Sequence, residues 1–396
     1  MRVADGAHLT YCTNVHAGES WADMAEQLRR HLPPVKARVS PAAPFGVGLR
    51  LSARAAAELA GDAAALAALR AWLRAEGLYV FTINGFPFGT FHGTAVKDGV
   101  YRPDWRDPQR LAYSDRLAWL LADLLDGEAD DVTGSVSTVP GGYKAHLTGD
   151  GDRAAMVEML LRHAATLDRI ARGRGRIITL ALEPEPGCLL ETTDEAAAFF
   201  AEDLFGAAAV GRFAALSGYG RGDAEAALRR HLGLCLDTCH AAVMFEDADA
   251  ALDRLAAAGV PIAKIQVSSG LVVPRADGEG RAALVPFAEG VYLHQTAGRD
   301  ADGAITRFAD LPDALASDHG GEWRVHFHVP VWAGRCGPFA TTHAFTAAVL
   351  ERQRRDGLTK HLEVETYTWD VLPHGARPLS LTDSLALELQ WTRERL

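Results

Sequence analysis

Carboxylate and imidazole side chains occur in pairs near the ends of short apolar segments of this sequence. A carboxylate at such a place is costly to bury unless a cation or a hydrogen-bond donor compensates it. Carboxylates and imidazoles that converge are typical ligands of a divalent metal ion. The sequence therefore predicts a metal site built from some of these residues. The four pairs are Glu183 with Glu185, Asp237 with His240, His326 with His328, and Glu363 with Glu365.

The spacing within the pairs indicates how they are presented. Three of the pairs are two residues apart, which places both members on one face of a strand. Asp237 and His240 are three apart across a strand-to-helix turn, so both can reach one site. Gln266 occupies the corresponding place in KIQVSSG, and its amide oxygen suits a hard cation better than zinc. The expected metal is accordingly Mn, Mg or Zn.

A second set of polar residues follows the earlier apolar segments and is predicted to bind a substrate's hydroxyl or carboxylate. For the two cations in this set, a solvated charge or an internal ion pair is an equally open interpretation. Phe86, Phe88 and Phe91 could line a pocket for a sugar ring or an apolar body, or form a lid on the rim. The predicted substrate-binding residues are Asn14, His16, Arg50, Asn84, His92 and Lys144.

The elements that must position these residues alternate between strands and helices. Short segments rich in β-branched and aromatic residues are separated by Ala- and Leu-rich segments of helical period, which indicates repeated β-α units with parallel strands. A (β/α)8 barrel would place the polar residues at the carboxyl ends of its strands. Nine segments qualify, one more than a barrel needs. They are 9–14, 45–52, 78–84, 133–139, 177–183, 233–237, 262–268, 323–331 and 361–367.

Two features set the domain organisation. Residues 270–321 are rich in Gly, Asp and Pro and are too long for a simple loop, so we expect an insertion near the active-site mouth, between strands seven and eight. No linker marks a boundary, and one TIM-barrel domain over 1–396 is predicted.

Composition excludes several classes of function. The chain has 396 residues and a formal charge of -11, which disfavours binding to nucleic acid or to an anionic membrane surface. Its five cysteines are scattered, so a disulfide framework is not expected. The first residues lack the pattern of a signal peptide, and no apolar run is long enough for a membrane span. We expect a cytoplasmic protein without membrane insertion, with a small-molecule substrate and with a homo-oligomer as one possibility.

The run GLCLDTCHAAVMFED resembles the DTCH signature of endonuclease IV (AP endonuclease family 2) and of the wider xylose isomerase-like barrels, the sugar phosphate isomerase-epimerase superfamily. The resemblance implies a metal held by Glu183, Asp237, Gln266 and Glu365. It also implies that His326 or His328 is the counterpart of a metal-binding His in a late loop of endonuclease IV. Gln266 departs from the family pattern, because the position usually carries His.

Over nearly its whole length the chain also resembles the EboE proteins, TIM-barrel members of gene clusters for metabolite traffic. The segments that carry this resemblance are LTYCTNVHAGESW, GLRLSARAA, GLYVFTINGFPFGTFHG, VYRPDW, ALEPEPGCLLETTDE, LDTCHAAVMFED and WRVHFHVPVW. It implies a context of secondary-metabolite export more than a particular reaction.

The function expected from these observations is isomerisation or epimerisation of a sugar-like or polyol metabolite. The metal would polarise a carbonyl and hydroxyl pair while Glu183 and Glu365, on strands expected to lie opposite each other, move the proton, with His240 beside them. The first alternative is a metal-dependent phosphoester hydrolase of the endonuclease IV type, with two or three metals. The second is a barrel that binds a metabolite without catalysis.

Overall fold

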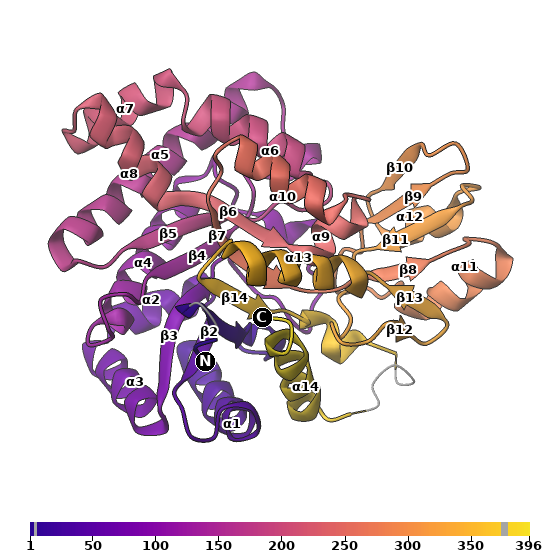
Figure 1. Cartoon of the computed structure of the whole chain (residues 1–396), viewed down its shortest axis with the longest axis horizontal. Coiled ribbons are helices and arrows are strands. Elements are labelled where there is room, and N and C mark those ends of the chain that lie inside the picture. The colour runs from indigo at the N-terminus through magenta and orange to yellow at the C-terminus, as the bar shows by residue number, and fades with distance from the viewer. Residues whose placement is uncertain (4–5, 374–378) are drawn as a thin grey trace.

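The computed structural model describes residues 1–3, 6–373 and 379–396, and its centre is a barrel of parallel strands (Figure 1). The eight strands follow the order β1-β14-β7-β6-β5-β4-β3-β2, and a bridge between Cys12 and Gly48 joins the two ends of this sheet. The predicted (β/α)8 barrel is confirmed. Its strands are β1 (His8–Tyr11), β2 (Phe45–Arg50), β3 (Leu78–Asn84), β4 (Gly134–Thr138), β5 (Ile178–Leu182), β6 (Leu232–Asp237), β7 (Ile262–Val267) and β14 (His361–Val364).

Helices surround the barrel, and local sequence signals fix several of their ends. Ser20 and Asp23 form a capping box at the start of α1, Asp107 caps α4 ahead of Pro108, and Gly77 ends α3 in the left-handed conformation. No helix of the described segments is long and apolar enough to cross a membrane. The helices are α1 (Trp21–Val39), α2 (Ala53–Gly61), α3 (Ala63–Glu76), α4 (Pro108–Leu125), α5 (Asp150–Arg174), α6 (Thr193–Phe199), α7 (Ala207–Ser217), α8 (Arg221–His231), α9 (Thr238–Val243), α10 (Ala248–Ala257), α13 (His343–Asp356) and α14 (Leu381–Arg393).

The long insertion lies between the seventh and eighth barrel strands, as predicted, and carries a sheet of its own beside the barrel (Figure 1). This antiparallel sheet extends past the predicted end at residue 321. Its strands, in spatial order, are β10 (Ile305–Phe308), β9 (Thr296–Arg299), β11 (Glu322–Val325), β8 (Leu271–Val273), β13 (Phe339–Thr341) and β12 (Arg335–Cys336), and its helices are α11 (Gly278–Leu284) and α12 (Leu311–Ala316).

The ninth strand segment predicted from the sequence, 323–331, belongs partly to this second sheet. Only its first residues pair with neighbours, in β11, and residues 326–331 leave the sheet. The apolar alternation of this segment reflects burial without strand pairing, because Phe327, Val329 and Val331 are all buried. The segment carries His326 and His328 to the barrel.

The barrel interior is charged at mid-height. Lys264 of β7 and Glu363 of β14 lie 2.5 Å apart, and both side chains are fully buried. Gly48 of β2 makes room for this pair, since a Cβ atom there would stand 1.7 Å from Glu363 Oε1. Glu363, one of the carboxylates singled out in the sequence, is thus neutralised within the chain.

Candidate metal centre at the barrel mouth

Three carboxylates converge at the carboxyl ends of the strands. Glu183 follows β5, Asp237 ends β6 and Glu365 follows β14, and one oxygen of each lies within 4.8 Å of the others. All three side chains are buried. Among the described residues, Glu183 Oε2 and Asp237 Oδ2 have no hydrogen-bond partner. Buried oxygens of this kind require a cation, a proton or a water as partner.

Burial raises the pKa of Glu183 well above its ordinary value, and the charges of Glu365 and Asp237 raise it further. Burial likewise raises the pKa of Glu365, together with the charges of Asp237 and Glu363. Lys264 opposes both shifts without cancelling them. Without an added cation, Glu183 and Glu365 therefore hold a proton more strongly than exposed carboxylates do.

Hydrogen bonds orient two of the three carboxylates, Asp237 and Glu365. Asp237 Oδ1 accepts hydrogen bonds from Cys239 N at 2.7 Å, His240 N at 2.9 Å and Ser268 Oγ at 2.6 Å. Asp237 thereby caps α9 while its Oδ2 stays free. Glu365 Oε1 accepts from Asn14 Nδ2 at 2.7 Å and Asn84 Nδ2 at 3.0 Å.

Glu183 and Glu365, which were predicted to be on opposite strands of the barrel, lie close together instead. Strands β5 and β14 are separated in the barrel by β6 and β7, so they do not stand opposite. Glu183 and Glu365 consequently meet Asp237 on one side of the barrel.

Three histidines beside the carboxylates are held in the tautomer that binds metals. The Nδ1 atoms of His240 and His328 lie 2.9 Å from the carbonyl oxygens of Pro184 and Glu365, respectively. His326 Nδ1 lies 2.7 Å from Gln295 Oε1. These oxygens only accept hydrogen bonds, so each Nδ1 donates and each Nε2 is left with a lone pair.

The lone pairs of His240 and His326 face each other. Their Nε2 atoms are 3.1 Å apart. Two nitrogens bound to one zinc ion at about 2.0–2.1 Å stand a little over 3 Å apart, so the separation fits two ligands of one cation. Glu185 forms a second donor group with these two histidines. Burial raises the pKa of Glu185 and lowers the pKa of His326.

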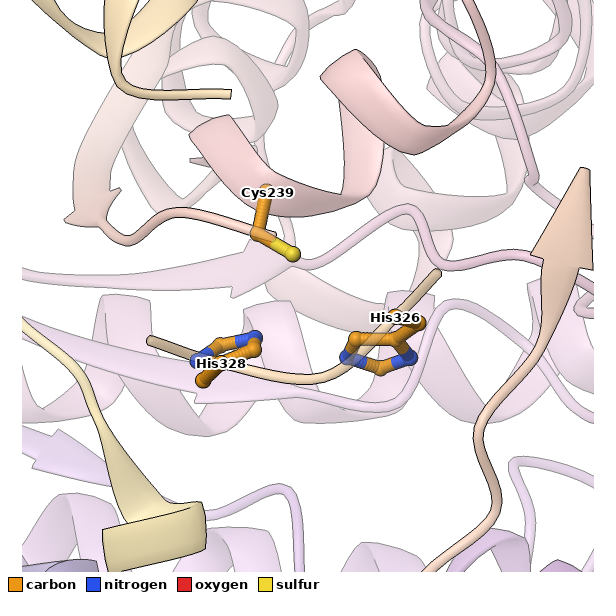
Figure 2. Close-up of side chains that lie close together, drawn as sticks. All are labelled: Cys239, His326 and His328. Atoms are coloured by element: carbon orange, nitrogen blue, oxygen red, sulfur yellow. The ribbon is translucent and has the colours of Figure 1, made fainter. Parts of the chain in front are cut away.

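His328 links the histidines to the carboxylates. Its Nε2 has no hydrogen-bond partner in the described part of the chain and lies 4.0 Å from Asp237 Oδ2. Burial lowers the pKa of His328 to about 4, so the ring is neutral at physiological pH. Figure 2 shows that the sulfur of Cys239 points toward the rings of His326 and His328. Burial raises the pKa of Cys239 well above its ordinary value, which leaves a packed thiol and not a nucleophile.

Gln266 lies in register between Asp237 of β6 and Glu363 of β14. It is fully buried, and neither its Oε1 nor its Nε2 finds a hydrogen-bond partner among residues 1–3, 6–373 and 379–396. An amide with both atoms unsatisfied is expensive to bury. Its position is consistent with the predicted role as a ligand from below.

A pocket opens above the cluster. Of the predicted substrate-binding residues, Asn14 and Asn84 line it, and their amide nitrogens are used to hold Glu365. The polar lining residues are Asn14, Asn84, Lys97, Glu183, Glu185, His240, His326 and Glu365.

The other four predicted substrate-binding residues do not line this pocket. The Arg50 guanidinium donates to the carbonyl oxygens of Gly18 and Gly89 and pairs with Glu19. His16 stacks on His31, with ring centroids 4.1 Å apart. Burial lowers the pKa of His92 to about 4. For Arg50 and His16, internal contacts replace the expected contact with substrate.

Lys144 forms ion pairs with Glu191 at 3.0 Å and Glu195 at 2.8 Å and lines a separate hollow. The internal ion pair weighed for this residue is the arrangement observed.

Some residues of the site had no usable signal in the sequence. Tyr101 donates to Glu185 at 2.6 Å, and Gln295 of the insertion orients His326. Neither stands at the end of a barrel strand. Lys264 could have been found, because it precedes Gln266 by two residues and so shares its face of β7.

Comparisons with known proteins reach only distant structures. No protein-family profile and no curated protein matches the sequence. Among solved structures, the chain is similar to 3-keto-D-glucoside 4-epimerase YcjR from E. coli (13% identity, 98% of this chain and 99% of that one, TM-score 0.47). It is also similar to the IolI protein with a bound zinc atom (12%, 97% and 96%, TM-score 0.46). A third is a xylose isomerase domain protein from Salmonella typhimurium LT2 (12%, 99% and 97%, TM-score 0.41).

The structural neighbours are thus xylose isomerase-like TIM barrels, the class of fold expected from the sequence. At these identities the similarity concerns the fold, and the chemistry must be argued from the site itself.

Proposed function

We propose that this protein is a divalent-cation-dependent isomerase or epimerase of a sugar-like or polyol metabolite. One observation carries the proposal: Glu183, Asp237 and Glu365 converge, all buried, and Glu183 and Glu365 line a pocket. The described residues supply no donor to Glu183 Oε2 or Asp237 Oδ2.

The residues fit a divalent cation. Glu183, Asp237 and Glu365 bring ligand oxygens within 4.8 Å of one another, and within the described part of the chain Glu183 Oε2, Asp237 Oδ2 and the Gln266 amide have no hydrogen-bond partner. A cation held there would polarise a substrate carbonyl and the hydroxyl on the neighbouring carbon, which would acidify the C–H bond of that carbon. An oxygen-rich donor set favours Mn or Mg, whereas the imidazoles favour Zn.

The carboxylates of the chain then move the proton. Glu183 lines the pocket and would accept a proton from the substrate carbon. Glu365, oriented by Asn14 and Asn84, returns a proton to the substrate. One proton leaves and one is added, so no oxidant is required. His240 lines the same pocket and can accept a substrate hydroxyl proton at Nε2.

The test is exchange of carbon-bound protons for deuterium in a panel of ketoses, with and without Mn, followed by NMR. We expect metal-dependent exchange that Glu183→Gln abolishes. Glu191→Gln is the matched control, because Glu191 is also buried but pairs with Lys144 outside the pocket. Exchange that persists in Glu183→Gln, or no exchange with any ketose, would contradict the proposal.

A second candidate is metal-dependent phosphoester hydrolysis. The observation that favours it is the separate donor group of Glu185, His240 and His326, which offers a place for a second cation. Elemental analysis of the purified protein separates the candidates: one metal per chain supports the isomerase, and two or more support the hydrolase.

The context of secondary-metabolite traffic is proposed on the EboE-like sequence segments alone. Deletion of the gene should then change the distribution of a secondary metabolite between cells and medium. An unchanged distribution would leave the isomerase proposal standing without this context.

A further inference from the structure

The pocket above the carboxylates has two chemically different parts. Its floor is polar, whereas one wall is built from Phe91 after β3, Tyr292 of the insertion and Tyr367 after β14. Their ring centroids lie 5.2 Å (Phe91–Tyr292), 5.4 Å (Phe91–Tyr367) and 5.0 Å (Tyr292–Tyr367) apart. Three segments distant in sequence thus bring aromatic rings to one place. We call Phe91, Tyr292 and Tyr367 the aromatic wall.

The aromatic wall continues into the catalytic floor. Tyr367 Oη lies 3.4 Å from His326 Nε2, so the wall and the metal-ligating histidines are in contact. Phe86, Val100 and Leu293 extend the apolar lining. A molecule whose reactive end reaches Glu183 and Glu365 must therefore also contact apolar surface.

The pocket offers no free cationic side chain to an anionic group. Lys97 is the one Lys or Arg among the described lining residues. Its Nζ donates to the carbonyl oxygens of Glu289 at 3.2 Å and Tyr292 at 2.7 Å, and to Asp310 Oδ2 at 2.7 Å. An ammonium group has three donors, and all are committed. Sites that recognise phosphate ordinarily present Arg, Lys or free backbone donors.

A flat apolar group packed on the aromatic wall would gain both area burial and ring contacts.

Building on the proposed function, we infer that the substrate is an uncharged conjugate: a hydroxylated ring that meets the carboxylates, joined to an aromatic or similarly flat apolar group that packs against the aromatic wall. Sugar phosphates are excluded from this class, because Lys97 is committed and the floor is acidic.

The inference is tested by binding, without turnover. Phenyl β-D-glucoside, methyl β-D-glucoside and glucose 6-phosphate are titrated into the metal-loaded full chain by calorimetry. We expect the phenyl glucoside to bind about tenfold tighter than the methyl glucoside. Glucose 6-phosphate should bind no tighter than the methyl glucoside.

Two variants in the segment after β3 test whether the aromatic wall causes the preference for the phenyl glucoside. Phe91→Leu should remove most of the preference for the phenyl group. Phe88→Leu is the matched control, because Phe88 packs on Tyr113 and does not line the pocket. Both variants keep an apolar side chain, and thermal unfolding checks that each is folded.

Equal affinities of the two glucosides, undetectable binding of the phenyl glucoside, or tighter binding of glucose 6-phosphate would overturn the inference. A preference that survives in Phe91→Leu would overturn the role of the aromatic wall. Tight phenyl glucoside binding without proton exchange in any substrate would retain the inference and reject the isomerase, so the two failures are distinguishable.

Discussion

Two groups of buried carboxylates lie in the same barrel and are balanced in different ways. At mid-height, Glu363 is paired with Lys264 at 2.5 Å. At the mouth, Glu183, Asp237 and Glu365 converge, and one oxygen each of Glu183 and Asp237 receives no hydrogen bond from the described residues. Glu363 of β14 and Glu365, which follows β14, belong to the two different groups although they are only two residues apart.

The comparison shows how a buried carboxylate that is neutralised within the chain differs from one that is not. Where the fold needs a buried acid, the chain supplies the cation. Burial is the largest single influence on the pKa of Lys264 and lowers it, but Glu363, Cys235 and Cys12 together raise the pKa overall. Where the chain supplies none, a proton or an external cation must balance the charge. The unsatisfied group is the one that can do chemistry.

The largest expected effect comes from removing the internal cation. Lys264→Met leaves Glu363 buried without a partner and should lower the free energy of unfolding by about 3–5 kcal/mol. Urea denaturation at pH 7 measures it. The double variant Lys264→Met with Glu363→Gln should recover most of the loss. If it is no more stable than the single variant, the pair does not act as a self-contained unit.

Another buried carboxylate, Glu388 of α14, is balanced by a proton. Burial raises its pKa from 4.5 to about 7, although Thr366 Oγ1 and Val331 N donate to it. The folded state binds this proton more tightly than the unfolded state, so its contribution to stability is complete below pH 4.5 and is lost as the pH rises to about 7.

Glu388→Gln removes this titration. Relative to the wild type, the variant should gain up to about 3 kcal/mol between pH 4.5 and pH 7 and stay level above that. Urea denaturation across this range gives the difference. A difference that does not depend on pH would show that Glu388 is not protonated in the folded protein.

Adding a cation to the mouth should stabilise the protein by mass action. At about 100 times its dissociation constant, Mn or Zn should raise the free energy of unfolding by about 2.7 kcal/mol. Asp237→Asn should suppress this gain, whereas Glu388→Gln should retain it. Because the pKa values of Glu183 and Glu365 are raised, binding must release protons and the affinity should rise with pH. Stabilisation that survives in Asp237→Asn would place the metal elsewhere.

The smallest effect on stability concerns Gln266, which lies between the two groups. Gln266→Met removes an unsatisfied amide at similar volume, so stability without metal should change by about 1 kcal/mol or less. Affinity for Mn should fall about tenfold if the amide is a ligand. Calorimetry measures both in one preparation, and an unchanged affinity would remove Gln266 from the ligand set.

Much of the fold could be predicted because its signals are local. Eight of the nine strand segments correspond to barrel strands, since alternation of apolar strands with amphipathic helices is written in neighbouring residues. The segment 323–331 was the exception. Its alternating apolar residues are buried by the insertion, and alternation alone does not reveal whether a buried segment is paired.

The sequence by itself determined that acids and histidines stand at the ends of barrel strands, because strand polarity places those ends together. Only the tertiary structure decided which of them are free. Glu363 is neutralised by Lys264, 99 positions away from it, and Arg50 and Lys144 are used by neighbouring groups, whereas Glu183, Asp237 and His328 keep orphaned atoms. Whether a charge is balanced depends on contacts between distant segments, which no local pattern records.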